Sequence, residues 1–175
     1  MKGLVIVAHP DDETMFCGGT IAKLKWDWTV VSAAHSLDSP RGREFAAACN
    51  VLGARPIMLA VRYQGKQATS PIDGAEVRRR LLATVCLDEY DVVLTHNEDG
   101  EYGHRDHIVV NSVVGELRNR AIWWFGFNES TFDLAIKLDN RAREAKRAAM
   151  EQYQSQGDRI MLVEVRDEET YKVYW

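Results

Sequence analysis

Short runs of apolar and β-branched residues alternate along this 175-residue chain with segments of helical period. Each run is apolar at nearly every position, which is typical of strands that a parallel sheet buries on both faces. The segments between the runs repeat apolar residues at every third or fourth position, as amphipathic helices do. Because strands and helices alternate, the sequence predicts a three-layer α/β/α, Rossmann-like fold with a mostly parallel sheet. The predicted strands are Leu4–Ala8, Thr29–Ala34, Ile57–Val61, Val92–Thr95 and Ile122–Phe127.

The C-terminal part of the chain departs from this alternation. A long helix is predicted from about Leu138 to Gln154, followed by two short strands, Ile160–Val165 and Tyr171–Tyr174. The charged segment Arg166–Thr170 is predicted to be the turn of a hairpin at the sheet edge. No internal repeat or long linker divides the sequence, so we expect residues 1–175 to form a single domain.

Charge and hydropathy argue against two classes of partner. The net charge of −4 gives no bulk attraction to nucleic acid or to an anionic membrane. No apolar stretch approaches the length of a membrane span, and the chain leads straight into a strand rather than into a signal peptide, so we expect a cytoplasmic protein. Two basic runs fall in helical segments and are predicted to be solvated faces. They are Arg78, Arg79 and Arg80, and Arg141, Arg143, Lys146 and Arg147.

The three cysteines give no sign of a disulfide framework or of a thiolate metal cluster. Cys17, Cys49 and Cys86 are odd in number, far apart in the sequence and embedded in apolar helical patterns. We therefore expect all three to be reduced residues of the core.

All five histidines follow predicted strands. His9 and His35 come after the first two strands, His96 follows the fourth strand, and His104 and His107 lie in the loop after it. In open α/β sheets, ligands bind just outside the carboxyl ends of the strands. The sequence therefore predicts a functional site at this edge of the sheet.

The residue types near this edge indicate a metal site. His9 and Asp12 lie three residues apart across a turn at Pro10, and His107 arrives from a second loop. Two histidines and one carboxylate are the protein ligands of many catalytic zinc sites, although imidazole and carboxylate also suit Fe²⁺, Mn²⁺ or Ni²⁺.

Further acids and histidines would supply the rest of a hydrolytic site. Asp11 is left free beside the metal ligand Asp12 and is a candidate general base for an attacking water. His104 is a candidate for stabilising the charge that develops on a carbonyl oxygen, with Asp106 holding its ring in one tautomer.

A purely structural interpretation of the first motif stands beside this one. Asp12 alone could cap a helix, with Glu13 favouring the helix dipole and Pro10–Asp11 forming a simple turn. The second cluster of histidines argues against that interpretation. His96 is better explained as a hydrogen-bonded core or supporting histidine than as a ligand. No glycine-rich phosphate-binding loop follows the first strand.

Two motifs together resemble a known family. "AHPDDE" (residues 8–13) follows the first strand and "THNEDGEYGHRDH" (95–107) begins at the end of the fourth. Together they resemble the LmbE/PIG-L family of zinc-dependent N-deacetylases, which act on N-acetylglucosamine-type sugars. The segment "RGREFAAACNVLGA" (41–54) is similar to the family's helix after the second strand, and "AKRAAMEQYQSQ" (145–156) is similar to its late helix.

The resemblance carries residue roles with it. It implies metal ligands at His9, Asp12 and His107 and, with them, a zinc or other divalent cofactor. The remaining roles that it implies are a general base at Asp11, an oxyanion-stabilising histidine and its orienting carboxylate at His104 and Asp106, and substrate contacts at Arg41 and Tyr102.

The sequence also departs from the family pattern. Arg105 replaces a usual proline, and Arg62–Gln67 reads "RYQGKQ" where the family often has an aspartate-glycine that touches the sugar. We expect an N-deacetylase acting on a small N-acetylated amino sugar or its conjugate. A metal-assisted phosphoester hydrolase and a non-catalytic sugar-binding relative are the alternatives, and a homo-oligomer is compatible with the sequence.

Overall fold

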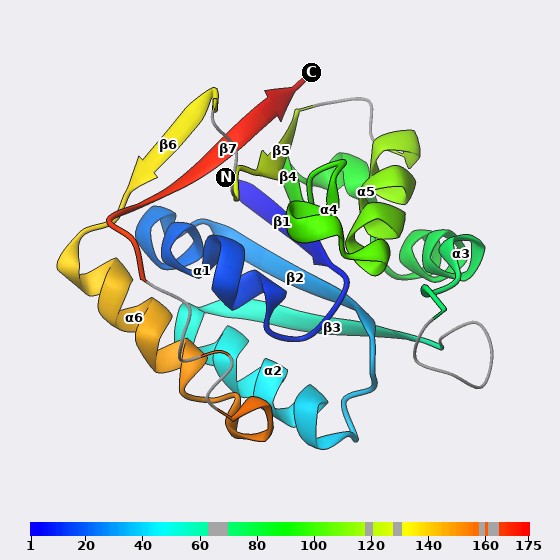
Figure 1. Cartoon of the computed structure of the whole chain (residues 1–175), viewed down its shortest axis with the longest axis horizontal. Helices are drawn as coiled ribbons and strands as arrows, with labels where there is room; N and C mark the ends of the chain where they lie inside the picture. Colours follow the sequence, from blue (N-terminus) through cyan, green and yellow to red (C-terminus); the bar gives the residue numbers. More distant parts are fainter. Residues whose placement is uncertain (63–69, 118–120, 128–130, 158–159, 161–164) are drawn as a thin grey trace.

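The computed structural model describes residues 1–62, 70–117, 121–127, 131–157, 160 and 165–175. Within these ranges the chain forms a seven-stranded sheet of order β3-β2-β1-β4-β5-β7-β6, in which neighbouring strands from β3 to β5 are parallel (Figure 1). The predicted mostly parallel α/β fold is confirmed. The strands are β1 (Lys2–Val7), β2 (Asp27–Ala34), β3 (Ala54–Val61), β4 (Val92–Thr95), β5 (Ile122–Phe125), β6 (Leu134–Lys137) and β7 (Glu168–Tyr174).

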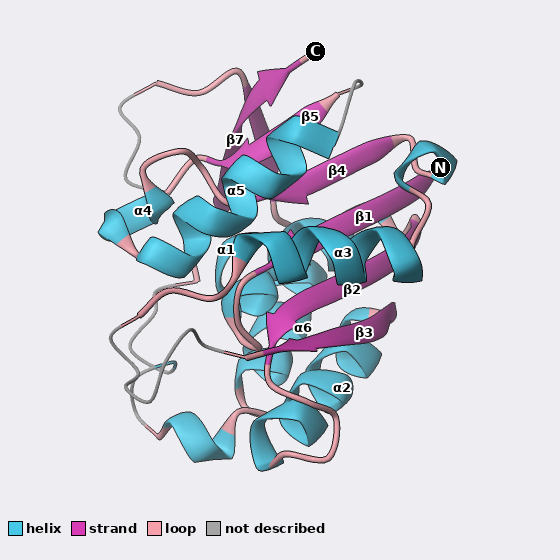
Figure 2. Cartoon of the chain, turned by 90° about the vertical axis from the view of Figure 1, so that its right-hand side faces the viewer, coloured by secondary structure: helices cyan, strands magenta, loops and turns pink. Residues whose placement is uncertain are grey.

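Helices cover both faces of the parallel part of the sheet. Figure 2 shows α3 and α5 in front of the strands, with α1 and α6 behind them. The α-helices are α1 (Asp12–Leu24), α2 (Pro40–Leu52), α3 (Gly74–Thr84), α4 (Gly100–Gly103), α5 (Arg105–Leu117) and α6 (Asn140–Met150). Two short 3₁₀ helices, η1 (Leu87–Glu89) and η2 (Gln154–Gln156), complete the described helices. Among the described residues, no helix has both the length and the apolar character that crossing a membrane requires.

Strand β1 explains why both faces are covered. Val5 and Val7 point into a cluster shared with α1, α2 and α6, whereas Leu4 and Ile6 point into a cluster shared with α3 and α5. All four side chains are fully buried. Because successive side chains of a strand point to opposite faces, a continuous apolar run needs a helix layer on each side.

The C-terminal strands differ from the prediction. Strand β7 lies between β5 and β6 and pairs antiparallel with both. Glu168–Thr170, predicted as part of a turn, are strand residues because β6 pairs with them. The predicted strand Ile160–Val165 falls mostly on residues 161–164, which lie outside the described residues. The predicted helix Leu138–Gln154 is shorter, since α6 ends at Met150 and η2 follows.

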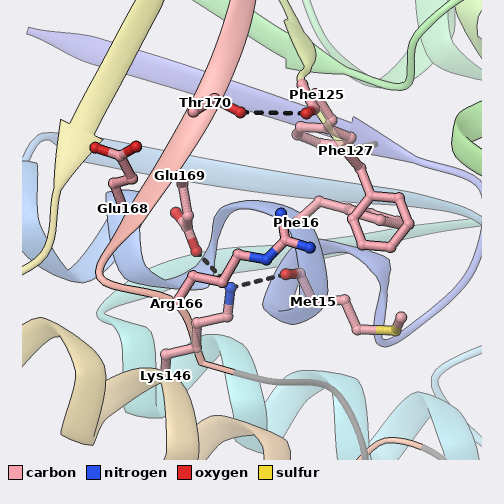
Figure 3. A pocket seen from close by; sticks show the side chains of 10 residues that line it. Met15, Phe16, Phe125, Phe127, Lys146, Arg166, Glu168, Glu169 and Thr170 are labelled. Carbon is pink, nitrogen blue, oxygen red and sulfur yellow. Dashed lines mark hydrogen bonds and ion pairs between the residues drawn. The ribbon is translucent and has the colours of Figure 1, made fainter. Parts of the chain in front are cut away.

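Two predictions about burial are wrong. Cys86 is exposed just before η1, whereas Cys17 and Cys49 are buried as expected. Lys146, predicted to lie on a solvated face, is 4% exposed. Its Nζ donates to Glu169 Oε1 at 2.6 Å and to the Met15 carbonyl at 2.7 Å, so it joins α6 to β7 and α1 (Figure 3). Lys146 can be buried despite its charge because the buried carboxylate of Glu169 neutralises that charge.

Candidate metal and catalytic site

A cavity of about 550 Å³ opens at the carboxyl edge of the parallel strands. Strands β1, β2 and β4 end beside it, as the position of the histidines predicted. The cavity is lined by His9, Asp11, Asp12, Met15, His35, Arg41, Tyr102, His104, Asp106, Gln156 and Ile160. Of these, His9, Asp11, Asp12, Arg41, Tyr102, His104 and Asp106 were selected from the sequence.

The turn after β1 brings two acids into the cavity. Asp11 has a left-handed backbone conformation, with φ 111° and ψ −31°, and α1 begins at the next residue. The Asp12 carboxylate folds back, so that its Oδ2 accepts the backbone N–H of His9 at 2.8 Å. Asp12 therefore does not cap α1 by a hydrogen bond to a later N–H, and its carboxylate stays beside His9 in the cavity.

Asp12 lies between the two histidines predicted to share a metal with it. Its Oδ2 is 3.4 Å from His9 Nδ1 and 3.4 Å from His107 Nε2. Donors that each lie about 2.0–2.1 Å from one cation in tetrahedral geometry are separated by roughly 3.3 Å. These two separations fit a shared cation.

His107 offers the clearest candidate donor atom for a cation. Its Nε2 is buried and has no hydrogen-bond partner among the described residues. Its Nδ1 lies 2.5 Å from Glu101 Oε2, and a carboxylate can only accept, so Nδ1 carries the proton. The Nε2 of a neutral His107 therefore has a free lone pair facing Asp12. The chemistry of this donor set fits a divalent cation.

His96 supports the site without offering a lone pair. Its Nε2 accepts the backbone N–H of Ala8 at 3.0 Å, and its Nδ1 donates to Glu101 Oε2 at 2.9 Å. Two groups of three, His9 with His104 and His107, and Asp12 with His96 and His107, have donor atoms within 4.8 Å of one another, and the predicted set of His9, Asp12 and His107 is divided between them. Because the His96 lone pair is already used, the second group offers only Asp12 and His107. His96 is thus the hydrogen-bonded core histidine that the sequence favoured.

Glu101 organises these histidines and was not selected from the sequence. It is 6% exposed and accepts from the rings of both His96 and His107 and from the backbone N–H of Asn97. Burial raises the pKa of Glu101, but hydrogen bonds from the two histidines outweigh burial and hold that pKa below its usual value. The motif loop contains this glutamate, but its spacing gave no indication that its side chain turns inward.

Asp106 orients a different histidine from the one predicted. Its Oδ2 lies 2.8 Å from His9 Nε2, and its Oδ1 accepts the backbone N–H of Ile72 at 2.9 Å. His104 Nδ1 instead accepts the backbone N–H of Asp106 at 3.3 Å. The pairing of the Asp106 carboxylate with His104 is therefore corrected, because the first turn of α5 directs this side chain toward His9.

His104 nevertheless lies in the cavity beside the metal-ligand candidates. Its ring centroid is 4.8 Å from that of His9 and 4.4 Å from that of His107. Burial, together with the charges of His107 and His9, lowers the pKa of His104. A neutral His104 can present one ring nitrogen to a ligand in the cavity, since a backbone N–H already occupies the other.

Arg41 contacts the candidate base directly. Its Nη2 donates to Asp11 Oδ2 at 2.5 Å, and its Nε donates to the Pro10 carbonyl at 3.0 Å. Burial and the charge of Asp12 raise the pKa of Asp11 to about 7, while Arg41 opposes the shift. A carboxyl with a pKa near neutrality suits proton transfer at neutral pH.

Tyr102 and Arg105 lie on the exposed side of the site. Tyr102 is 58% exposed, and its ring centroid lies 5.9 Å from that of His104. Arg105 is exposed at the first position of α5. Arg62 is exposed, but the rest of the altered segment Arg62–Gln67 lies outside the described residues.

Three of the five described residues other than glycine that have a positive φ lie at or beside this site, and the other two are Lys25 and Ala60. Asp11, His35 and Glu101 each have a positive φ, of 111°, 62° and 60°. Such conformations cost on the order of 1–3 kcal/mol each for residues other than glycine and persist where the surroundings hold them. Residues in these conformations cluster at functional sites, so the backbone adds support to the side-chain evidence.

The chain is similar to known proteins over the part of the sequence that contains both motifs of this site. The family model described as PIG-L, GlcNAc-PI de-N-acetylase, matches residues 4–117. The chain is 27% identical over 199 residues to a 1D-myo-inositol 2-acetamido-2-deoxy-alpha-D-glucopyranoside deacetylase of Segniliparus rotundus, covering 81% of this chain and 63% of that protein. The chain spans from about half to 63% of the length of the curated relatives it matches.

Solved structures show the same fold at low sequence identity. A deacetylase from teicoplanin biosynthesis, solved as a bog complex, has a TM-score of 0.73 at 16% identity, covering 99% of this chain and 98% of that one. GalB, a 4-carboxy-2-hydroxymuconate hydratase of Pseudomonas putida KT2440, has a TM-score of 0.64 at 16% identity, covering 100% and 97%. The family match spans both motifs of the site, and the chain therefore belongs to the PIG-L family.

Proposed function

We propose that this protein is a metal-dependent hydrolase that removes the N-acetyl group from an N-acetylglucosamine-type amino sugar or its conjugate. The observation that carries the proposal is the buried Nε2 of His107, which has no hydrogen-bond partner among the described residues and faces Asp12, a residue that lines the cavity together with Asp11. Family membership and the deacetylase activity for which the Segniliparus relative is named support the choice of an amide of an amino sugar.

His9, Asp12 and His107 would hold the cation, and we propose zinc, with Fe²⁺ as an alternative that the same donors suit. A bound divalent cation supplies positive charge that acidifies water and polarises a carbonyl oxygen. Asp106 holds Nε2 of His9, and Glu101 holds Nδ1 of His107. The other nitrogen of each ring is therefore fixed toward the site.

Asp11 would transfer the proton of the reaction, and His104 would stabilise the negative charge that develops on the carbonyl oxygen. Asp11 takes a proton from the attacking water, whose oxygen forms a bond to the acetyl carbonyl carbon. His104 donates a hydrogen bond to the carbonyl oxygen as its negative charge develops. The C–N bond then breaks, the leaving amine receives the proton that Asp11 took from water, and acetate leaves.

Arg41 and Tyr102 are the proposed substrate contacts. Arg41 holds Asp11 in this structure, and about a quarter of its side chain is exposed to the cavity, so it can also reach a sugar hydroxyl. Tyr102 lies on the rim, where it can approach the amide carbonyl.

A small N-acetylated amino sugar is the proposed partner. Cytoplasmic location and homo-oligomer formation stay predictions from the sequence.

The two adjacent aspartates allow a matched test. Asp11→Asn should keep the metal, because no proposed ligand changes, and should lower kcat by about 10²–10⁴-fold through loss of the base. Asp12→Asn should lower metal occupancy and rate together, because an amide is a poor ligand for the cation. Metal analysis by mass spectrometry is paired with acetate release from a panel of N-acetylhexosamines. Wild-type protein with a full metal site and no acetate release from any of them would refute the proposed function.

A further inference from the structure

A buried network joins the strained turn at Asp11 to a residue far away in the sequence. The backbone N–H of Asp11 donates to Glu13 Oε2 at 3.0 Å. The other oxygen of Glu13, Oε1, accepts from Thr14 Oγ1 at 2.6 Å and from the Tyr153 hydroxyl at 2.5 Å. Glu13 is completely buried and Tyr153 is 1% exposed. The carboxylate therefore depends on these partners, since water does not reach it.

This network bears on the conformation that places the candidate base. With φ 111°, the Asp11 backbone is in the left-handed region that residues other than glycine adopt only when other contacts hold it. The Asp11 N–H is fixed by Glu13, and the orientation of Glu13 is fixed in turn by Tyr153. A relaxed turn would move the Asp11 carboxylate relative to Asp12 and His107 without changing any proposed metal ligand.

Tyr153 is itself anchored by a separate set of contacts. It belongs to the apolar cluster that α1 and α2 share, and its N–H donates to the Met150 carbonyl at 3.1 Å at the end of α6. Two residues later, Ser155 donates from its N–H and its hydroxyl to Glu44 of α2, at 2.7 and 2.5 Å. The segment after α6 therefore presents the Tyr153 hydroxyl to Glu13 from a fixed position.

We propose that Tyr153 is a positioning residue for the reaction, acting through Glu13 to hold Asp11 in its left-handed conformation. The inference rests on the proposed function, because it assigns to Asp11 the role of base. It adds a contribution from the segment after α6, beyond the residues 4–117 that match the family model.

The chain provides a matched control for this inference. Tyr171 is also fully buried, and its hydroxyl donates to Thr20 Oγ1 at 2.6 Å, farther along the same helix α1. Tyr171→Phe removes a buried hydroxyl, as Tyr153→Phe does, but it leaves the turn at Asp11 untouched. Both variants should lose stability, so a difference in kcat between them reports positioning rather than folding.

The experiment measures kcat, KM and metal content of the folded holoenzyme for both variants, with N-acetylglucosamine as substrate. We expect Tyr153→Phe to lower kcat by about 10- to 100-fold, the scale of a small displacement of a reacting group, with KM and metal content unchanged. Tyr171→Phe should keep the wild-type kcat. Equal kcat for the two variants and wild type, in protein that releases acetate, would overturn the inference while leaving the proposed function standing.

A second pair of variants covers the case in which Tyr153→Phe fails to fold. Glu13→Gln keeps an oxygen for the Asp11 N–H, and the hydroxyls of Thr14 and Tyr153 can rotate to accept from the new amide. Its kcat should stay within about threefold of wild type, whereas Glu13→Ala should lose at least about tenfold with its metal retained. A Glu13→Ala variant with wild-type kcat would also overturn the inference.

Discussion

Replacing Glu101 by glutamine should weaken the proposed metal site, because Glu101 holds the Nδ1 of His107. The carboxylate accepts hydrogen bonds from His96 Nδ1 at 2.9 Å, from His107 Nδ1 at 2.5 Å and from Asn97 N at 2.9 Å. A glutamine has one acceptor oxygen and one NH₂ group. Whichever way the amide is turned, its NH₂ group faces at least one of these N–H donors, so one buried hydrogen bond becomes a contact between two donors.

The size of the effect follows from these contacts. One unsatisfied buried donor costs about 1–3 kcal/mol, and exchanging a charged acceptor for a neutral one weakens each remaining bond by about 1 kcal/mol. We therefore expect the free energy of unfolding to fall by about 3 kcal/mol, which lowers Tm by about 6–12 °C in a chain of this size. Because Glu101 fixes the proton on His107 Nδ1, metal affinity should also fall by about 10- to 100-fold.

The assay combines thermal unfolding of metal-free protein with a competitive titration of Zn²⁺. Glu98→Gln is the matched control, since Glu98 is an exposed residue of the same loop and its substitution should stay within about 0.5 kcal/mol of wild type. If Glu101→Gln kept both the Tm and the zinc affinity of the wild type, the inference that this carboxylate orients His107 would be wrong.

Two further predictions concern residues whose burial the sequence did not reveal. Lys146→Met should lower the free energy of unfolding by about 3–5 kcal/mol in urea titration, because it leaves the buried Glu169 carboxylate without its cation; a loss below about 1 kcal/mol would contradict this. In native protein, a thiol reagent should modify Cys86 alone of the three cysteines, because burial shields the Cys17 and Cys49 thiols and raises the pKa of both; modification of all three before unfolding would contradict this.

The first motif was predictable because its chemistry is local. His9, Asp11 and Asp12 lie within four consecutive residues at the end of β1, so any fold that buries this strand brings them to one sheet edge. His107 could be added because the next parallel strand in the sheet, β4, ends at the same edge. Glu101 could not be predicted in the same way. Its side chain reaches His96 and His107 only because the strained backbone at Glu101 turns it inward.

The strand order beyond β5 could not be predicted from the sequence. Strand β6 has only four residues, and β7 separates it from β5, so the pairing joins segments distant in the chain. The acidic residues at the start of β7 were predicted to belong to a charged turn. Glu169 is nevertheless buried, because Lys146 and the backbone N–H groups of Gly19 and Thr20 satisfy its carboxylate.

By itself, the sequence determined the α/β class, the edge of the sheet that carries the site and the two motifs that place the chain in its family. Apolar periodicity and local spacing are enough for these, because each depends on neighbours in the chain. Only the tertiary structure decided which side chain orients which. It paired Asp106 with His9, Glu101 with His107 and Tyr153 with Glu13, since a buried polar group takes whichever partner the packing brings within hydrogen-bond distance.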